Sequence, residues 1–235
     1  FEEIYTGNRV KDALKVCGVD EIHDGIGRTG IVAVIRGRST SSGSMIGLRA
    51  DMDALPLAEH NDFSWKSCKP GLMHGCGHDG HTAMLIGAAR YLAETRNFDG
   101  TAVLIFQPAE EAGGGAEIMV KEGILDRFGI THVYALHNRP GTPLGEFLGA
   151  PGPVMAAVDT LRVEIDGMGG HGAHPEDTHD PIAAMITMIG AIQTIVSRNR
   201  KGTDALVISV TQMEAGANGA DNVIPASGWF GATIR

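Results

Sequence analysis

The sequence predicts an α/β protein with a mostly parallel sheet, joined to a second, smaller α+β domain. Strand-like and helix-like segments alternate through the first part of the chain, which is typical of layered α/β domains. One apolar run, 101–106 (TAVLIF), has the composition of a strand buried on both faces. A segment dense in Pro and Gly, 140–154, then precedes a region with a different pattern. We therefore expect one domain over 1–152 and another over 153–235.

The elements of the first domain follow from the spacing of apolar residues. Residues 9–17 carry apolar side chains at helical spacing, and 79–94 predicts a helix with Asp79 in its first turn, where a negative charge favours the helix dipole. The remaining segments are strands over 31–37 and 45–50 around a Gly/Ser-rich turn at 39–44, the strand 101–106, a helix over 114–123 and a strand over 131–137.

The second domain shows a β-α-β-β order. Residues 160–166 alternate as a half-buried strand does, and 181–199 predicts a long helix with Pro181 near its start. Strands are expected over 205–213 and 228–235. This order suits a small ferredoxin-like α+β domain with one sheet face covered. Such a domain would continue with a further helix and strand, so we expect both domains to be incomplete in this chain.

Composition excludes several classes of protein. The net charge of −9 gives no general attraction to nucleic acid or to anionic lipid, so we expect neither as a partner. The longest apolar run, 182–192, is too short to span a bilayer. Three cysteines form a sparse, odd set, which disfavours a disulfide scaffold and favours a reducing compartment. No basic and apolar leader is apparent, and we expect a cytoplasmic protein.

The segment 73–81 (MHGCGHDGH) concentrates possible metal ligands. Cys76 and His78 flank a single glycine directly before a predicted helix. A thiolate and an imidazole are good ligands for transition metals, and the glycine lets the backbone bend around an ion. A Gly-rich turn with solvated histidines is the alternative, which three histidines and one cysteine within nine residues disfavour.

Two further polar groups follow predicted strands. Glu110 and Glu111 come after the apolar strand 101–106, and adjacent carboxylates repel each other unless a positive charge lies nearby. One could ligate a metal while its neighbour transfers protons, although an exposed acidic loop is an equally ordinary explanation. His137 also follows a strand, and alone it would be assigned a structural role. Ligands of open α/β sheets bind beyond the carboxyl ends of the strands, so these groups could converge.

Other polar residues suggest supporting roles. Asp51 and Asp53 follow the strand 45–50, where an aspartate could hydrogen-bond a ligating histidine or simply cap a turn. In the second domain, His171, Asn222 and Arg235 are suited to binding an oxyanion and a substrate carboxylate. Taken singly, each of these three is better explained as a turn or surface residue.

The motifs taken together resemble those of the M20 metallopeptidase family, and most closely its amidohydrolase branch of hippurate hydrolases and N-acyl-amino-acid amidohydrolases. The matching segments, in the family's order, are 47–57 (GLRADMDALPL), 73–89 (MHGCGHDGHTAMLIGAA), 104–111 (LIFQPAEE), 135–138 (ALHN), 169–175 (GGHGAHP), 222–225 (NVIP) and 231–235 (GATIR). This resemblance implies a zinc-peptidase-like catalytic domain with an inserted lid or dimerisation domain.

The resemblance also implies roles for individual residues. Metal ligands would be Cys76, His78, Glu111 and His137, with Glu110 as general base and acid and Asp53 as the orienting aspartate. His171, Asn222 and Arg235 would contact the substrate or its oxyanion, with His171 presented across a dimer interface. The wider family has a ligating histidine two residues before its aspartate, where this chain has Asp51, so Cys76 and His78 are interpreted as the replacement pair. A further histidine ligand of the family comes from a C-terminal segment beyond residue 235, so we expect an incomplete ligand set.

The implied reaction is metal-assisted hydrolysis of the amide bond of a small N-acyl amino acid. Two divalent ions would take part, and Mn²⁺, Zn²⁺, Ni²⁺ and Co²⁺ are all compatible with thiolate, imidazole and carboxylate ligands. A homodimer or homotetramer through the second domain is the expected assembly. Two alternatives are a non-catalytic protein stabilised by a closed metal site, which Glu110 disfavours, and a nucleotide-binding domain, for which no phosphate-binding motif is present.

Overall fold

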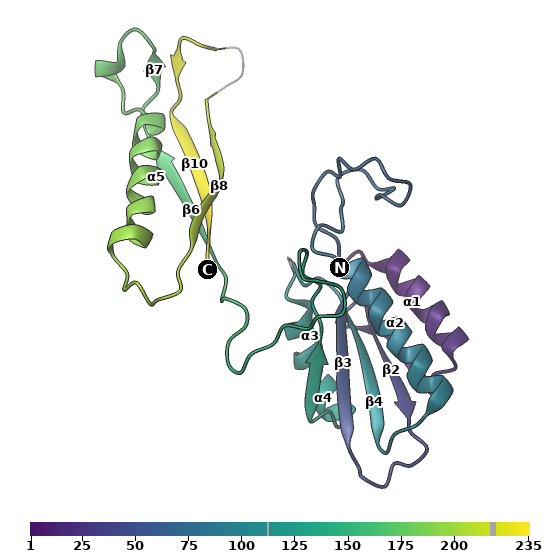
Figure 1. Cartoon of the computed structure of the whole chain (residues 1–235). Helices are drawn as coiled ribbons and strands as arrows, with labels where there is room; N and C mark the ends of the chain where they lie inside the picture. Colours follow the sequence, from purple (N-terminus) through teal and green to yellow (C-terminus); the bar gives the residue numbers. More distant parts are fainter. Residues whose placement is uncertain (112, 217–219) are drawn as a thin grey trace. The chain divides into compact units, whose positions relative to one another are not determined.

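A computed structural model describes residues 1–111, 113–216 and 220–235, which divide into two compact units, Phe1–Pro143 and Leu144–Arg235. Unit 1 contains a five-stranded sheet with strand order β1-β2-β4-β3-β5 (Figure 1). Its elements are α1 (Ile4–Cys17), β1 (Glu21–Ile26), β2 (Gly30–Arg36), β3 (Met45–Asp51), α2 (His78–Thr95), β4 (Thr101–Gln107), α3 (Gly115–Lys121), α4 (Ile124–Arg127) and β5 (His132–Ala135).

The sheet is mixed, so the prediction of a mostly parallel sheet was wrong. β3 pairs in parallel with both β4 and β5, but β2 pairs antiparallel with β4, and β1 pairs antiparallel with β2. The turn between β1 and β2 spans only 27–29, and so short a connection can join only antiparallel strands. β1 was missed because its sequence, EIHDGI, contains no continuous apolar run. The strands on either side of the turn 39–44 do not pair, because β4 lies between them.

Two apolar clusters cover the two faces of this sheet. β4 is buried along its whole length and supplies alternate side chains to each cluster, as a central strand must. Leu104 and Phe106 join the cluster that contains Leu14 of α1 and Leu85 of α2. Val103 and Ile105 join the other cluster with residues of α3 and α4. The helices therefore lie in two layers around β4, in agreement with the buried strand expected at 101–106.

Unit 2 is a small α+β unit. Its elements are β6 (Asp159–Asp166), β7 (Gly170–His171), a 3₁₀ turn (Pro175–Asp177), α5 (Pro181–Arg198), β8 (Ile208–Ala215), β9 (Val223–Ile224) and β10 (Ser227–Ile234). β6, β10 and β8 form an antiparallel sheet, and β7 pairs with β9. The sheet packs against α5, where Met185 and Phe230 are fully buried.

The first residues of α5 are those that the sequence predicts for the start of a helix. The Asp180 side chain accepts a hydrogen bond of 2.8 Å from the backbone N–H of Ile182, and Pro181 occupies the first helical position. By length and composition alone, α5 is also apolar enough to cross a membrane, the one helix of the described residues for which this holds. Its packing against β6, β8 and β10 shows that it forms the helical layer of unit 2.

Asp20 joins three elements of unit 1 beside the sheet. Its carboxylate accepts hydrogen bonds from the backbone N–H of Arg36 (2.6 Å) and from Nη1 of Arg96 (2.8 Å). Arg96 also donates to the carbonyl oxygen of Gly18 at the end of α1 (3.1 Å). Burial by itself would raise the pKa of Asp20, but these hydrogen bonds and the two guanidinium charges outweigh it and lower the pKa below its ordinary value of 3.8.

Asp20→Asn should therefore destabilise the protein at neutral pH, by about 1 kcal/mol. A carboxylate with a lowered pKa stabilises the fold above its unfolded-state pKa, and this contribution is lost as the pH falls through the folded-state value. The difference between Asp20→Asn and the unsubstituted protein should thus shrink as the pH is lowered from 5 towards 3, as measured by urea unfolding. Asp12→Asn is the control, because Asp12 makes only an exposed pair with Lys15. An equal effect of the two substitutions at pH 7 would contradict the assignment.

Candidate metal centre

The parallel strands of unit 1 bring the predicted residues to one edge of the sheet. Asp51 at the end of β3 lies opposite Gln107 at the end of β4, and Arg49 lies opposite Ala135 of β5. The segments that carry Asp53, Glu110 with Glu111, and His137 all start within a few residues of these strand ends. α2 begins at the same edge with His78. The convergence expected at the carboxyl ends of the strands is therefore present in unit 1.

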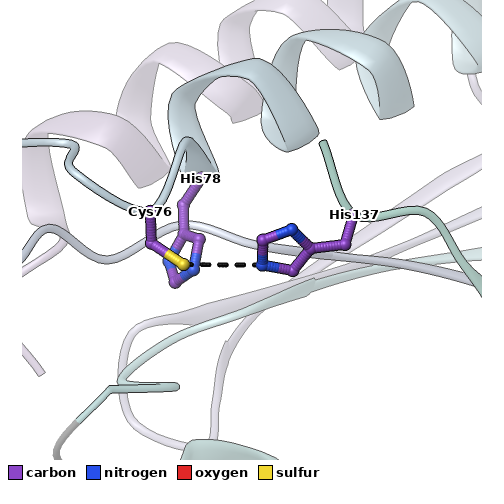
Figure 2. A group of neighbouring side chains, drawn as sticks. All are labelled: Cys76, His78 and His137. Atoms are coloured by element: carbon purple, nitrogen blue, oxygen red, sulfur yellow. Dashed lines mark hydrogen bonds between the residues drawn. The ribbon is translucent and has the colours of Figure 1, made fainter. Parts of the chain in front are cut away.

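Cys76, His78 and His137 form the centre of this site (Figure 2). Each offers a ligand atom, and these atoms all lie within 4.8 Å of one another. Sγ of Cys76 lies 3.4 Å from Nε2 of His137. Gly77, between Cys76 and His78, has a φ of +82°, which a residue with a side chain rarely adopts. The glycine thus lets the chain turn sharply enough for the thiol and the imidazole to face the same point.

Asp53 orients His78. Nδ1 of His78 lies 3.1 Å from Oδ1 of Asp53, while Oδ2 accepts the backbone N–H of Glu111 at 2.9 Å. Burial by itself would raise the pKa of Asp53, but hydrogen bonds from His78 and from the backbone of Glu111 and Glu110 outweigh it and lower the pKa to about 2. The ionised carboxylate keeps the ring proton on Nδ1, so that Nε2 of His78 carries the lone pair.

Nε2 of His78 is a buried atom without a hydrogen-bond partner. Among the described residues, the only other buried side-chain nitrogen or oxygen atom without a hydrogen-bond partner is Nδ1 of His74. Oxygen atoms of Asp51 and Glu111 lie 3.6 and 3.8 Å from it, too far for a hydrogen bond. A buried imidazole lone pair normally has a partner, and a metal ion would supply one here.

Glu110 and Glu111 lie beside His78. Ligand atoms of these three residues fall within 4.8 Å of one another. The preceding residue, Ala109, has a φ of +46°, a left-handed conformation that costs energy for alanine. This turn places two carboxylates side by side at the end of β4.

The negative charge of this cluster acts on Cys76. Burial, a hydrogen bond to Glu111 and the charges of Glu111, Glu110 and Asp51 raise the pKa of the thiol to about 11. A divalent cation would reverse this effect, because a coordinated thiol loses its proton. Thiolate, imidazole and carboxylate donors together fit a transition-metal ion, and with the unpartnered nitrogen of His78 they make the site a good fit for one.

The residues predicted to bind substrate all lie in unit 2. His171 and Asn222 come close together, because the backbone N–H of Gly172 donates to the carbonyl oxygen of Asn222 (2.7 Å) and β7 pairs with β9. Arg235 directly follows β10, and the eight residues of that strand separate it from the turn that leaves β9. Within unit 2, the structure thus brings His171 and Asn222 together and leaves Arg235 at the other end of the sheet.

The sequence analysis did not assign roles to two further residues of the site, His81 and Asn138. His81 lies one helical turn after His78 and binds Asp51, and Asn138 contacts the ring of His81. The spacing of His78 and His81 is a usable signal, since residues three apart on a helix share a face. Asn138 lies in the motif 135–138, but the contacts of its backbone N–H and its side-chain oxygen with the ring of His81 depend on the fold.

Comparisons with known proteins identify the family of this chain. Residues 47–231 match the family model described as peptidase family M20/M25/M40. The chain belongs to this family. It is 44% identical over its whole length to a hippurate hydrolase of Campylobacter jejuni and 38% identical to an N-acetylcysteine deacetylase of Bacillus subtilis. The chain spans 60% of the length of each of these relatives.

A solved structure of this M20 family shows the same fold. The Bacillus subtilis YXEP protein, a dinuclear metal-binding peptidase, is 34% identical and superposes with a TM-score of 0.70. The comparison covers 100% of this chain and 59% of that one. The resemblance inferred from the motifs is therefore confirmed at the level of the family.

Cys76→Ala should lower the metal content of this M20 protein, because it removes the sulfur donor that faces His137. Elemental analysis after dialysis against Mn²⁺ or Zn²⁺ measures the effect, and we expect the loss of at least half of the bound metal. Cys68→Ala is the matched control, since Cys68 is exposed and belongs to none of the ligand groups of the described residues. Unchanged occupancy in Cys76→Ala would show that the thiol is not a ligand.

Proposed function

We propose that the whole protein containing this chain is a metal-dependent amidohydrolase that cleaves the amide bond of N-acyl amino acids. The observation that carries this proposal is the meeting of Cys76, His78 and His137 with a pair of carboxylates at one sheet edge. Related M20 proteins named hippurate hydrolase and N-acetylcysteine deacetylase support the substrate class.

Four side chains would hold two divalent ions: Cys76, His78, Glu111 and His137. The ions, when bound, supply Lewis acidity that activates a water molecule and polarises the amide carbonyl. Mn²⁺, Zn²⁺, Ni²⁺ and Co²⁺ remain the candidates, since the donor set mixes soft sulfur with hard oxygen.

Glu110 would transfer the proton. Its carboxylate is exposed and lies beside Glu111, and among the described residues it makes no hydrogen bond or ion pair that would engage it elsewhere. It can accept a proton from the attacking water and then donate this proton to the leaving amine, as a general base and acid must. Asp53 would hold His78 in place during these steps, through the hydrogen bond to Nδ1.

Unit 2 would act as the lid or dimerisation domain and contact the substrate. His171 and Asn222 would stabilise the oxyanion, and the guanidinium of Arg235 would bind the free carboxylate of the amino acid through two parallel hydrogen bonds. A homodimer or homotetramer through this unit would allow residues from different copies to meet at one site.

A metal-stabilised binding protein without catalysis is the competing function. A structural zinc site uses four Cys or His ligands and leaves no carboxylate free for proton transfer. Glu110 beside Glu111 favours the hydrolase. An assay of N-benzoyl and N-acetyl amino acids with and without a chelator separates the two, because only the hydrolase gives a chelator-sensitive release of the amino acid.

Glu110→Gln should abolish turnover while the metal stays bound, because an amide cannot accept the proton that the reaction removes. We expect a loss of kcat of at least 100-fold, measured with an N-acyl amino acid, together with unchanged metal content. Glu117→Gln is the control, since Glu117 is an exposed residue of α3 paired with Lys121. Normal turnover by Glu110→Gln would remove Glu110 from its proposed role.

Arg235→Ala should raise KM for substrates with a free carboxylate more than for the corresponding amides. The loss of a bidentate contact to a carboxylate costs binding only where that carboxylate is present. Kinetics on one pair of substrates, an N-acyl amino acid and its C-terminal amide, measure this difference. Arg198→Ala, at the end of α5, is the matched control. Equal changes in KM for both substrates would place the carboxylate contact elsewhere.

A further inference from the structure

A buried chain of polar contacts runs beside the metal centre and belongs to none of the proposed catalytic steps. Asp51 and His81 are almost completely buried, and Oδ1 of Asp51 lies 2.6 Å from Nδ1 of His81. The other oxygen of Asp51 forms an ion pair with Arg49, whose Nη1 lies 2.8 Å away. Arg49 is held in turn by Gln107 of the neighbouring strand (2.8 Å). His81 is therefore anchored to the ends of both β3 and β4.

His81 connects Asp51 to the segment that follows β5. The backbone N–H of Asn138 donates to Nε2 of His81 (2.9 Å), so the neutral ring carries its proton on Nδ1 and donates it to Asp51. The side-chain oxygen of Asn138 lies 2.7 Å from the same Nε2 and would accept from it if the ring were doubly protonated. In either protonation state, the ring keeps one bond to Asp51 and one to Asn138.

Asn138 in turn orients His137. Nδ1 of His137 lies 2.7 Å from the carbonyl oxygen of Asn138, which leaves Nε2 of His137 to face Cys76. A Cβ atom on Gly77 would come within 1.9 Å of the Asn138 side chain, so this asparagine packs directly against the turn between Cys76 and His78. The rings of His81 and His137 lie edge to face, with centroids 4.5 Å apart.

His81 itself is a poor metal ligand in this arrangement. Ligand atoms of His81, Asp51 and His78 lie within 4.8 Å of one another, but both ring nitrogens of His81 are already hydrogen-bonded. His78 differs, since its Nε2 has no partner. The contacts therefore distinguish a ligand from a residue that holds a ligand in place.

We propose that His81, anchored by Asp51, is a positioning residue that fixes the backbone of Asn138 and thereby directs Nε2 of His137 at the metal beside Cys76. The inference rests on the proposed function only in taking His137 as a ligand. It assigns His81 no contact with substrate and no proton transfer in the reaction.

Two substitutions of His81 test the proposal through metal affinity. His81→Leu removes both hydrogen bonds, and it should weaken Zn²⁺ binding about tenfold or more, as is usual when the support of a ligand is lost. His81→Gln should restore affinity to within about threefold, because its amide can donate to Asp51 and accept from Asn138. Affinity is measured by titration of Zn²⁺ against a competing chelator dye, with circular dichroism to confirm folding. His60→Leu, in an exposed loop, is the control.

The outcomes separate this proposal from the proposed function. Unchanged affinity in His81→Leu, or a loss in His81→Gln as large as that in Cys76→Ala, would overturn the positioning role, the second result by making His81 a ligand. If His81→Leu does not fold, Asp51→Asn replaces it, because it removes the charge that holds the ring and should also weaken binding. The unsubstituted protein tests the function by itself: Zn²⁺ binding without hydrolysis of any N-acyl amino acid would overturn the function and leave the positioning role standing.

Discussion

The parallel pairing of β3 with β4 on one side and β5 on the other is the constraint on which the site depends. Parallel strands end at the same edge, so Asp53, Glu110 and His137 meet although they are far apart in the sequence. The crossover from β3 to β4 runs through α2, whose first residue is His78. A shift of one residue in either pairing would turn every side chain of the shifted strand to the opposite face and separate these groups.

The second constraint is charge. Asp51, Asp53, Glu110 and Glu111 gather around two imidazoles and a thiol, and in the described part of the chain Arg49 is the only arginine or lysine paired with any of these four acids. Burial raises the pKa of the Cys76 thiol, and the negative charges of this cluster raise it further. Carboxylates this close together are stable when a cation offsets their repulsion, so the charge distribution and the unpartnered nitrogen of His78 lead to the same conclusion.

The division between the proposed ligands and the residues that support them follows from hydrogen bonding. Asp53 binds one nitrogen of His78 and leaves the other free, whereas Asp51 and Asn138 occupy both nitrogens of His81. Two histidines of one helix, three residues apart, thus receive different roles from their neighbours. Membership of the M20 family, which includes a dinuclear metal-binding peptidase of similar structure, agrees with a metal centre here.

Local signals were enough to predict most elements of the fold. The apolar run of β4, the helical spacing of α2 and the Pro181 start of α5 lie in short windows of sequence, and all three agree with the structure. The mixed sheet was not predictable in this way, because pairing depends on strands distant in the chain. Neither the sequence of β2 nor that of β3 indicates that β4 lies between these two strands in the sheet.

By itself, the sequence determined which chemical groups this protein has for a metal centre and, through the order of its motifs, the family to which it belongs. Cys76, His78, Glu111 and His137 could be named as candidate ligands because the motifs that contain them resemble those of the M20 family. The resemblance implied Asp53 as the orienting aspartate, and the tertiary structure showed that it holds His78. The tertiary structure alone decided that Asp51 binds His81 and that a backbone N–H of Asn138 completes this chain of contacts. Such partners are set by distance and direction in space. Every residue except proline has a backbone N–H, so the sequence does not show which of these groups donates a hydrogen bond to a given side chain.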